Sequence, residues 1–93
     1  MSSPATFYSP GGEVGACGTA IQNSDLSVAL STEDFSSELC GTEFIVEYNG
    51  QGVAVAVADI CTACGKGNID LTTGAYEILA PLDTGAIEVT YEL

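Results

Sequence analysis

The sequence predicts a mainly β domain, a pseudo-symmetric barrel of about six strands, and three observations support this. Short runs rich in Val, Ile, Tyr and Phe, separated by Gly, Pro and Asn, are typical of strands joined by turns. Four cysteines in 93 residues are typical of a small domain stabilised by disulfides. A pattern of short strand, hydroxyl cap and helical turn at residues 27–35 is repeated at residues 68–76. Two such units around one core predict the barrel.

The strands expected in chain order are residues 5–9, 27–30, 43–48, 53–58, 68–71 and 86–93. The strongest signal is the pair of runs that flanks Asn49-Gly50-Gln51-Gly52, which predicts a β-hairpin. Two short helices are also expected. One begins at an N-cap on Ser31 and ends near Cys40, and the other is capped by Thr72 or Thr73 and is closed by Pro81.

The charge balance excludes several classes of partner. The chain has thirteen acidic residues against Lys66 alone and a net charge of −12, which repels nucleic acid and anionic membranes. It has no His, which excludes a His-dependent catalytic triad. No apolar run approaches the roughly 20 residues of a membrane-spanning helix. We expect a secreted monomer whose leader has been removed: residues 1–3 form a processed N-terminus with a restored start methionine, and residues 4–93 form one domain.

The cysteines are expected to form structural disulfides. Cys61-x-x-Cys64 is compatible with a redox pair, half a zinc site or a local disulfide. Zinc requires four Cys or His ligands, usually in two close pairs, whereas Cys17 and Cys40 are isolated and His is absent. The Gly-Lys-Gly that follows favours a turn over the helix of a redox motif. We therefore expect no metal and no cofactor. Of the three possible pairings we favour Cys17–Cys40 with Cys61–Cys64.

Two aspartates are the candidate catalytic residues. Asp59 ends an alternating apolar strand, where a carboxylate can also serve to accept bonds from the backbone amides of the Cys61 loop. Asp70 lies between Ile69 and Leu71, so its side chain points away from both. In the internal repeat it stands where Ala29 stands in the other half. A half-buried carboxyl near a second carboxylate has a raised pKa and suits a general acid for a glycosidic oxygen. The alternative is an ordinary exposed acid on a strand.

Aromatic side chains are the candidates for stacking on a sugar ring. Thr6 and Tyr8 point to one face of the first strand, and Tyr8 is the best candidate for a groove. Tyr48 is a second candidate. Tyr76 and Tyr91 match the apolar periodicity and are assigned to the core.

Five segments carry a family resemblance: A-T-F-Y-S at 5–9, G-A-C-G at 15–18, L-C-G at 39–41, V-A-D-I-C-x-x-C-G at 57–65 and I-D-L-T-x-x-A-Y at 69–76. In this order they resemble the double-psi β-barrel domain of expansins, fungal loosenins, rare-lipoprotein-A-like proteins and a group of endoglucanases. The resemblance implies a six-stranded double-psi β-barrel, with a polysaccharide groove lined by Thr6 and Tyr8. Asp59 and Asp70 are then expected to face each other across that groove, with Asp70 at the position of the general acid. The resemblance also supports the Cys17–Cys40 pairing.

Departures from the family pattern shape the functional prediction. Pro10 occupies the position of the hydrolytic base, and Ile60 stands where many relatives have Arg. Without that base, inverting hydrolysis lacks its second carboxylate, so we expect a protein that is not an enzyme. The prediction is a secreted, fungal, expansin-like or loosenin-like protein. It would bind and loosen cell-wall polysaccharide, namely cellulose, chitin or chitosan, with peptidoglycan as a further candidate.

Two alternatives remain open. One is a glycan-cleaving enzyme, either an endoglucanase or a lytic transglycosylase, with Asp70 as its general acid. The other is a cysteine-protease inhibitor with the same barrel fold, which would act through exposed loops and not through a groove.

Overall fold

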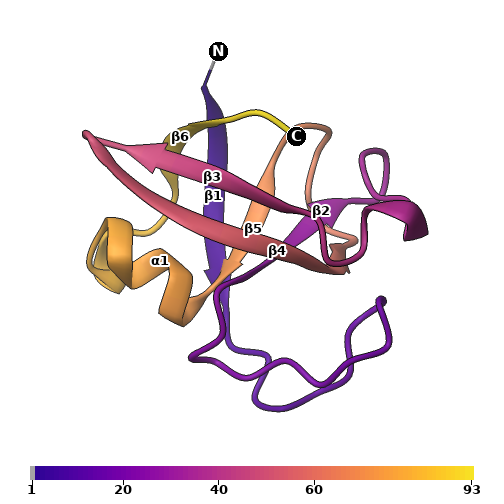
Figure 1. Ribbon diagram of the computed structural model, residues 1–93. Coiled ribbons are helices and arrows are strands. Elements are labelled where there is room, and N and C mark those ends of the chain that lie inside the picture. The colour runs from indigo at the N-terminus through magenta and orange to yellow at the C-terminus, as the bar shows by residue number, and fades with distance from the viewer. Residues whose placement is uncertain (1) are drawn as a thin grey trace.

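The computed structural model describes residues 2–93. Its elements are β1 (Ser3–Tyr8), β2 (Ser27–Ser31), the 3₁₀ turn η1 (Ser37–Leu39), β3 (Glu43–Tyr48), β4 (Gln51–Cys61), β5 (Ile69–Thr72), α1 (Thr73–Leu79), the 3₁₀ turn η2 (Leu82–Thr84) and β6 (Ile87–Tyr91). The strands close into a barrel in the order β1-β5-β2-β4-β3-β6 (Figure 1). The predicted mainly β, six-stranded barrel is thus confirmed.

The two halves of the barrel are related by a pseudo-twofold axis. The parallel pair β1–β5 corresponds to the parallel pair β4–β2, and the antiparallel pair β1–β6 corresponds to β4–β3. The axis passes between β2 and β5, where Ala29 lies opposite Asp70. These two residues are equivalent in the internal sequence repeat, so the repeat reflects a real symmetry of the fold.

The β3–β4 hairpin forms where the sequence predicts it. Tyr48 pairs with Gln51, which leaves Asn49 and Gly50 as a two-residue loop. Both loop residues have positive φ, 50° and 80°, as a type I′ turn requires. β4 continues past the predicted end at residue 58 to Cys61, because its last residues pair in parallel with β2.

The two predicted helices have different outcomes. After β5, Thr72 accepts a hydrogen bond from the backbone N–H of Ala75 and caps α1. After β2, Ser31 accepts the equivalent bond from Asp34, but only a turn follows, and η1 is the sole helical segment before Cys40. The prediction of a helix from Ser31 is therefore wrong. Residues 32–37 (Thr-Glu-Asp-Phe-Ser-Ser) include one strong helix former, Glu33, whereas α1 has Ala75, Glu77 and Leu79.

The core fills the barrel with aliphatic side chains from every strand and with the inner face of α1. The largest fully buried side chain is Tyr76 of α1, whose ring meets Phe7 of β1 edge-on at a centroid distance of 4.8 Å. Its hydroxyl donates a hydrogen bond to the carbonyl of Gly85. Tyr91 packs partly buried against Phe44, so the assignment of Tyr76 and Tyr91 to the core is confirmed. In the part of the chain that the structure describes, no helix has the length and apolar character to cross a membrane.

Candidate functional site

Strand register brings the two candidate aspartates to one level of the barrel. Thr6 on β1 lies opposite Asp70 on β5, Asp70 lies opposite Ala29 on β2, and Ala29 lies opposite Asp59 on β4. Neighbouring strands are about 4.8 Å apart, so two strand spacings put the aspartate Cα atoms about 10 Å from each other. Ala29 lies between them and is only 2% exposed. The structure thus places Thr6, Asp70 and Asp59 at one level of the barrel.

Tyr8 belongs to the same cluster. Burial raises the pKa of its phenol to about 12, and the charges of Asp59 and Asp70 add to that rise. Its hydroxyl is buried, with no hydrogen-bond partner among residues 2–93. Tyr8 is therefore held as a neutral phenol beside two carboxylates.

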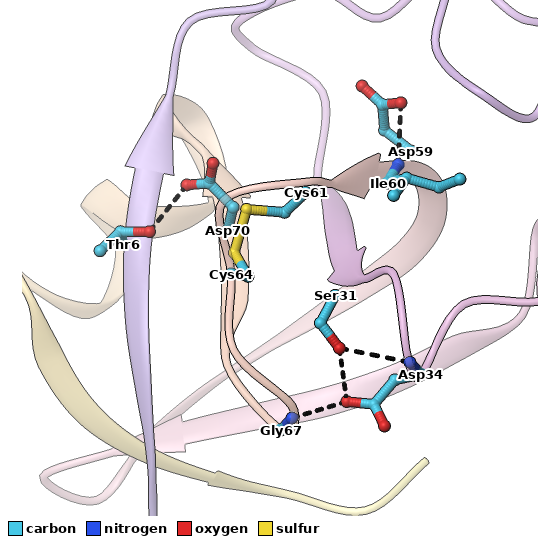
Figure 2. Close-up of a disulfide and its surroundings, with 9 residues drawn as sticks. All are labelled: Thr6, Ser31, Asp34, Asp59, Ile60, Cys61, Cys64, Gly67 and Asp70. Atoms are coloured by element: carbon cyan, nitrogen blue, oxygen red, sulfur yellow. Dashed lines mark hydrogen bonds between the residues drawn. A yellow bond between two sulfur atoms is a disulfide. The ribbon is translucent and has the colours of Figure 1, made fainter.

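Asp70 is half-buried and bonded to its neighbour on β1. The Thr6 hydroxyl donates a 3.0 Å hydrogen bond to Oδ1 of Asp70 (Figure 2). Burial raises the pKa of the Asp70 carboxyl above its usual 3.8, although the bond from Thr6 acts in the opposite direction; the charge of Asp59 adds to the rise. Asp70 is therefore protonated at a higher pH than an exposed aspartate would be. This is the electrostatic setting that the sequence predicts.

The hollow beside Asp70 is small. It has a volume of about 270 Å³ and is lined by Pro4, Thr6, Cys61, Ala63, Cys64, Asn68, Ile69 and Asp70. Small-molecule sites usually occupy roughly 300–1,000 Å³. Asp59 and Tyr8 do not line this hollow, so the two carboxylates do not share it.

Asp59 has a clear local role in holding a loop. Its Oδ1 accepts hydrogen bonds from the backbone N–H of Ala16, at 2.9 Å, and from its own neighbour Ile60, at 2.8 Å. Ala16 belongs to residues 11–24, the central part of the connection between β1 and β2, which we call loop 11–24. The bond to Ile60 resembles the backbone-capping alternative considered for Asp59. The bond to Ala16 joins residues far apart in sequence, and no local motif predicts it.

Both disulfides form with the predicted pairing. Cys17 is joined to Cys40 and Cys61 to Cys64, so the cysteines leave no free thiol. The first links loop 11–24 to the connection between β2 and β3. The second closes the tight turn after β4 (Figure 2).

A second polar cluster, which the sequence does not reveal, holds the loop between β4 and β5. Asp34 accepts a 2.7 Å hydrogen bond from the N–H of Gly67 and a 3.0 Å bond from the Ser31 hydroxyl (Figure 2). The Tyr91 hydroxyl donates to the carbonyl of the same glycine at 2.6 Å. Asp34 therefore joins the turn after β2 to the loop before β5. No sequence motif pairs residues this far apart.

Tyr48 lies elsewhere. It is at the end of β3, beside the hairpin turn, and packs against the core. Asp59 is eight residues further along β4 than Gln51, the partner of Tyr48, and at about 3.3 Å per residue this is roughly 26 Å. The structure therefore does not bring Tyr48 to the aspartates. Within residues 2–93, no group of three or more His, Cys, Asp or Glu is placed to hold a metal ion.

Replacing Asp70 with asparagine is expected to stabilise the fold at neutral pH. Because folding raises the pKa of Asp70, the ionised carboxylate is less favourable in the folded state than in the unfolded chain. This cost is absent below the unfolded value of 3.8, grows as the pH rises through the folded pKa, and is constant above it. Asparagine keeps an oxygen that can accept the Thr6 hydroxyl. Melting temperatures of the two proteins should coincide in acid and diverge toward neutral pH; a variant less stable than the parent at neutral pH would contradict this.

Comparison with known proteins identifies relatives of two kinds, although no protein-family model matches the chain. The papain inhibitor of Streptomyces mobaraensis is 35% identical in an alignment 95 positions long, which spans 94% of this chain and 66% of the inhibitor. The solved structure of the Streptomyces papain inhibitor superposes with a TM-score of 0.88 and 35% identity, over 99% of this chain and 91% of that chain. A Clavibacter michiganensis expansin, solved as a mutant in complex with cellohexaose, also gives a TM-score of 0.88, with 31% identity over 99% of this chain and 48% of its own.

These relatives confirm the double-psi β-barrel and correct the functional prediction. The prediction of a polysaccharide-loosening protein with a polysaccharide partner is wrong, because the relative that matches 94% of this chain is a papain inhibitor. The residues that suggested a sugar groove lie on the strands of the barrel, and that barrel is common to the inhibitor and to the expansin. They therefore indicate the fold and not the ligand. The expected fungal source is not supported either, since these relatives come from Streptomyces and Clavibacter michiganensis. The chain belongs to the family of the Streptomyces papain inhibitor.

Proposed function

We propose that this protein inhibits papain-like cysteine proteases. The observation that carries the proposal is the 35% identity to the Streptomyces papain inhibitor together with a TM-score of 0.88 over 91% of that chain. The match extends over loops as well as strands, since 99% of this chain is covered. The expansin matches the same 99% of this chain, so what favours the inhibitor is the higher identity and the 91% of the inhibitor chain that is matched, against 48% of the expansin.

The proposal is for a reversible, non-covalent inhibitor. All four cysteines are in disulfides, so the chain has no free thiol, and covalent capture would require the protease thiolate to attack one of these two bonds. Both disulfides also support secretion, because such bonds persist in oxidising compartments. We therefore propose a secreted inhibitor that acts by occupying the protease cleft.

The test is hydrolysis of a small peptide substrate by papain in the presence of increasing amounts of the folded chain. We expect reversible, competitive inhibition that the Asp70→Asn variant retains, since Asp70 lies beside the hollow between β1 and β5 and not on an exposed loop. Full papain activity at micromolar inhibitor would refute the function. Loss of inhibition in Asp70→Asn, with its fold intact, would instead place the contact at the cluster of aspartates.

A further inference from the structure

Loop 11–24 carries the most exposed large apolar side chain in the described part of the chain. Val14 is 69% exposed, ahead of Ile45 on β3 at 59%. The Val14 side chain does not pack in the barrel core, because Val14 lies on a connection and not on a strand of the barrel. It leaves an apolar group available for a partner.

The loop is also built to keep one shape. It folds back on itself as a narrow hairpin, with the N–H of Gly12 bonded to the carbonyl of Ile21 at 2.8 Å and a bridge between Val14 and Ala20. Near its tip, the backbone N–H of Ala16 donates a hydrogen bond to the Asp59 carboxylate, and the N–H of Cys17 donates one to the carbonyl of Ala58. Cys17 is also joined to Cys40 by a disulfide. A segment held in this way loses little conformational freedom on binding, which favours tight association.

Close packing makes the position of the loop depend on a single glycine. A Cβ at Gly15 would lie 2.6 Å from the carbonyl oxygen of Ala58 and 2.6 Å from Cδ1 of Ile21. The backbone therefore approaches β4 more closely than any other residue type allows. Small neighbours, Ala16 and Gly18, leave Val14 as the bulky group of this stretch.

The shape of the loop suits a cleft. In Figure 1 the segment between β1 and β2 extends beyond the lower end of the barrel, far from the β3–β4 hairpin. Its last residues contact α1, where the N–H of Gly74 donates a 2.8 Å hydrogen bond to the carbonyl of Asn23. An inhibitor that occupies an active-site cleft must present a protruding surface. By contrast, the face formed by β3 and β6 carries a hollow of about 720 Å³ that has Glu43, Glu47 and Glu92 among its lining residues. A hollowed face is less suited to entering a cleft than a protruding loop.

We infer that loop 11–24 is the inhibitory surface and that Val14 enters an apolar subsite of the protease cleft. This inference rests on the proposed function. Burial of a valine side chain is worth at least about 1.5 kcal/mol, which corresponds to roughly tenfold in affinity. The loop backbone around Val14 then lies along the cleft, where Gly15 and Ala16 allow close approach.

The decisive measurement compares papain inhibition constants for matched surface variants. We expect Val14→Asn to raise the inhibition constant about tenfold or more. Ile45→Asn removes a similarly exposed apolar side chain from β3 and should leave the constant within about twofold, a change too small to represent a buried contact. Gly15→Ala, which must displace the loop without altering Val14, should also weaken inhibition, whereas Gly65→Ala, whose nearest contact is 3.6 Å away, should not.

The outcomes separate the two claims. If the parent chain fails to inhibit papain, the proposed function and the inhibitory loop both fail. If the parent inhibits and Val14→Asn inhibits equally well, the function stands and the loop assignment is wrong. If Ile45→Asn weakens inhibition and Val14→Asn does not, the contact lies on the face of β3. Thermal unfolding of each variant confirms that it is folded under the assay conditions.

Discussion

Removing the Cys17–Cys40 disulfide, by replacing both residues with serine, is expected to lower the free energy of unfolding by about 3 kcal/mol. The bond joins residues separated by 23 positions, so it removes considerable freedom from the unfolded chain. In a domain of this size, such a loss lowers the melting temperature by about 10–20 °C. Papain inhibition should weaken too, even well below the melting temperature, because the bond fixes loop 11–24.

The matched control is the double serine variant of Cys61 and Cys64. That bond spans only three positions, and its loss is expected to cost about 2 kcal/mol, less than the loss of the longer-range bond. It lies outside loop 11–24, so inhibition should be preserved. Urea unfolding of both variants measures the free energy of unfolding, and the papain assay shows whether loop 11–24 still inhibits. If the two double variants inhibit equally, tethering of Cys17 has no part in the function.

Replacing Tyr76 with alanine is expected to have the largest effect on stability. The side chain is 0% exposed, packs against Phe7 and donates a hydrogen bond to Gly85. Truncation of a buried aromatic side chain costs about 3–5 kcal/mol, whereas a small domain has only about 5–15 kcal/mol in total. We expect a melting temperature at least about 15 °C lower, or a chain that does not fold at ambient temperature.

Tyr76→Phe separates the ring from its hydroxyl. It keeps the contact with Phe7 and removes only the donor to the carbonyl of Gly85, so its cost should be about 1–3 kcal/mol. Circular dichroism melts of the two variants measure the difference. Equal destabilisation by both substitutions would mean that the hydroxyl, and not packing of the ring, dominates the contribution of Tyr76.

Local signals in the sequence predict much of this fold. Asn49-Gly50 specifies its hairpin because both residues tolerate the positive φ of the turn. Thr72 predicts the start of α1 because its hydroxyl caps the helix in a manner that depends only on the next few residues. Ser31 makes the same cap, yet the residues after it cannot sustain a helix. Caps therefore predict where a helix can begin, and the following residues decide whether it forms.

Hydrogen bonds between polar groups on distant segments cannot be predicted from the sequence of either segment alone. The convergence of Asp59 and Asp70 could be inferred, since both were expected near strand ends around one loop. The bonds from Asp59 to Ala16 and from Asp34 to Gly67 join segments that become neighbours only when the barrel closes. For a related reason, the sequence predicts a protease inhibitor only as an alternative. The motif residues describe the barrel, whereas the proposed inhibitory residue, Val14, is an exposed valine with no distinguishing neighbours in sequence.

The pairing of β2 with β5 has a consequence for the origin of the domain. Val28 faces Leu71 and Leu30 faces Ile69, with Ala29 and Asp70 at the centre, so each half meets the other through equivalent positions. A chain of half this length would therefore find its complement in an identical copy of itself. Duplication and fusion of one ancestral gene could produce the present domain in a single step, after which each half was free to diverge.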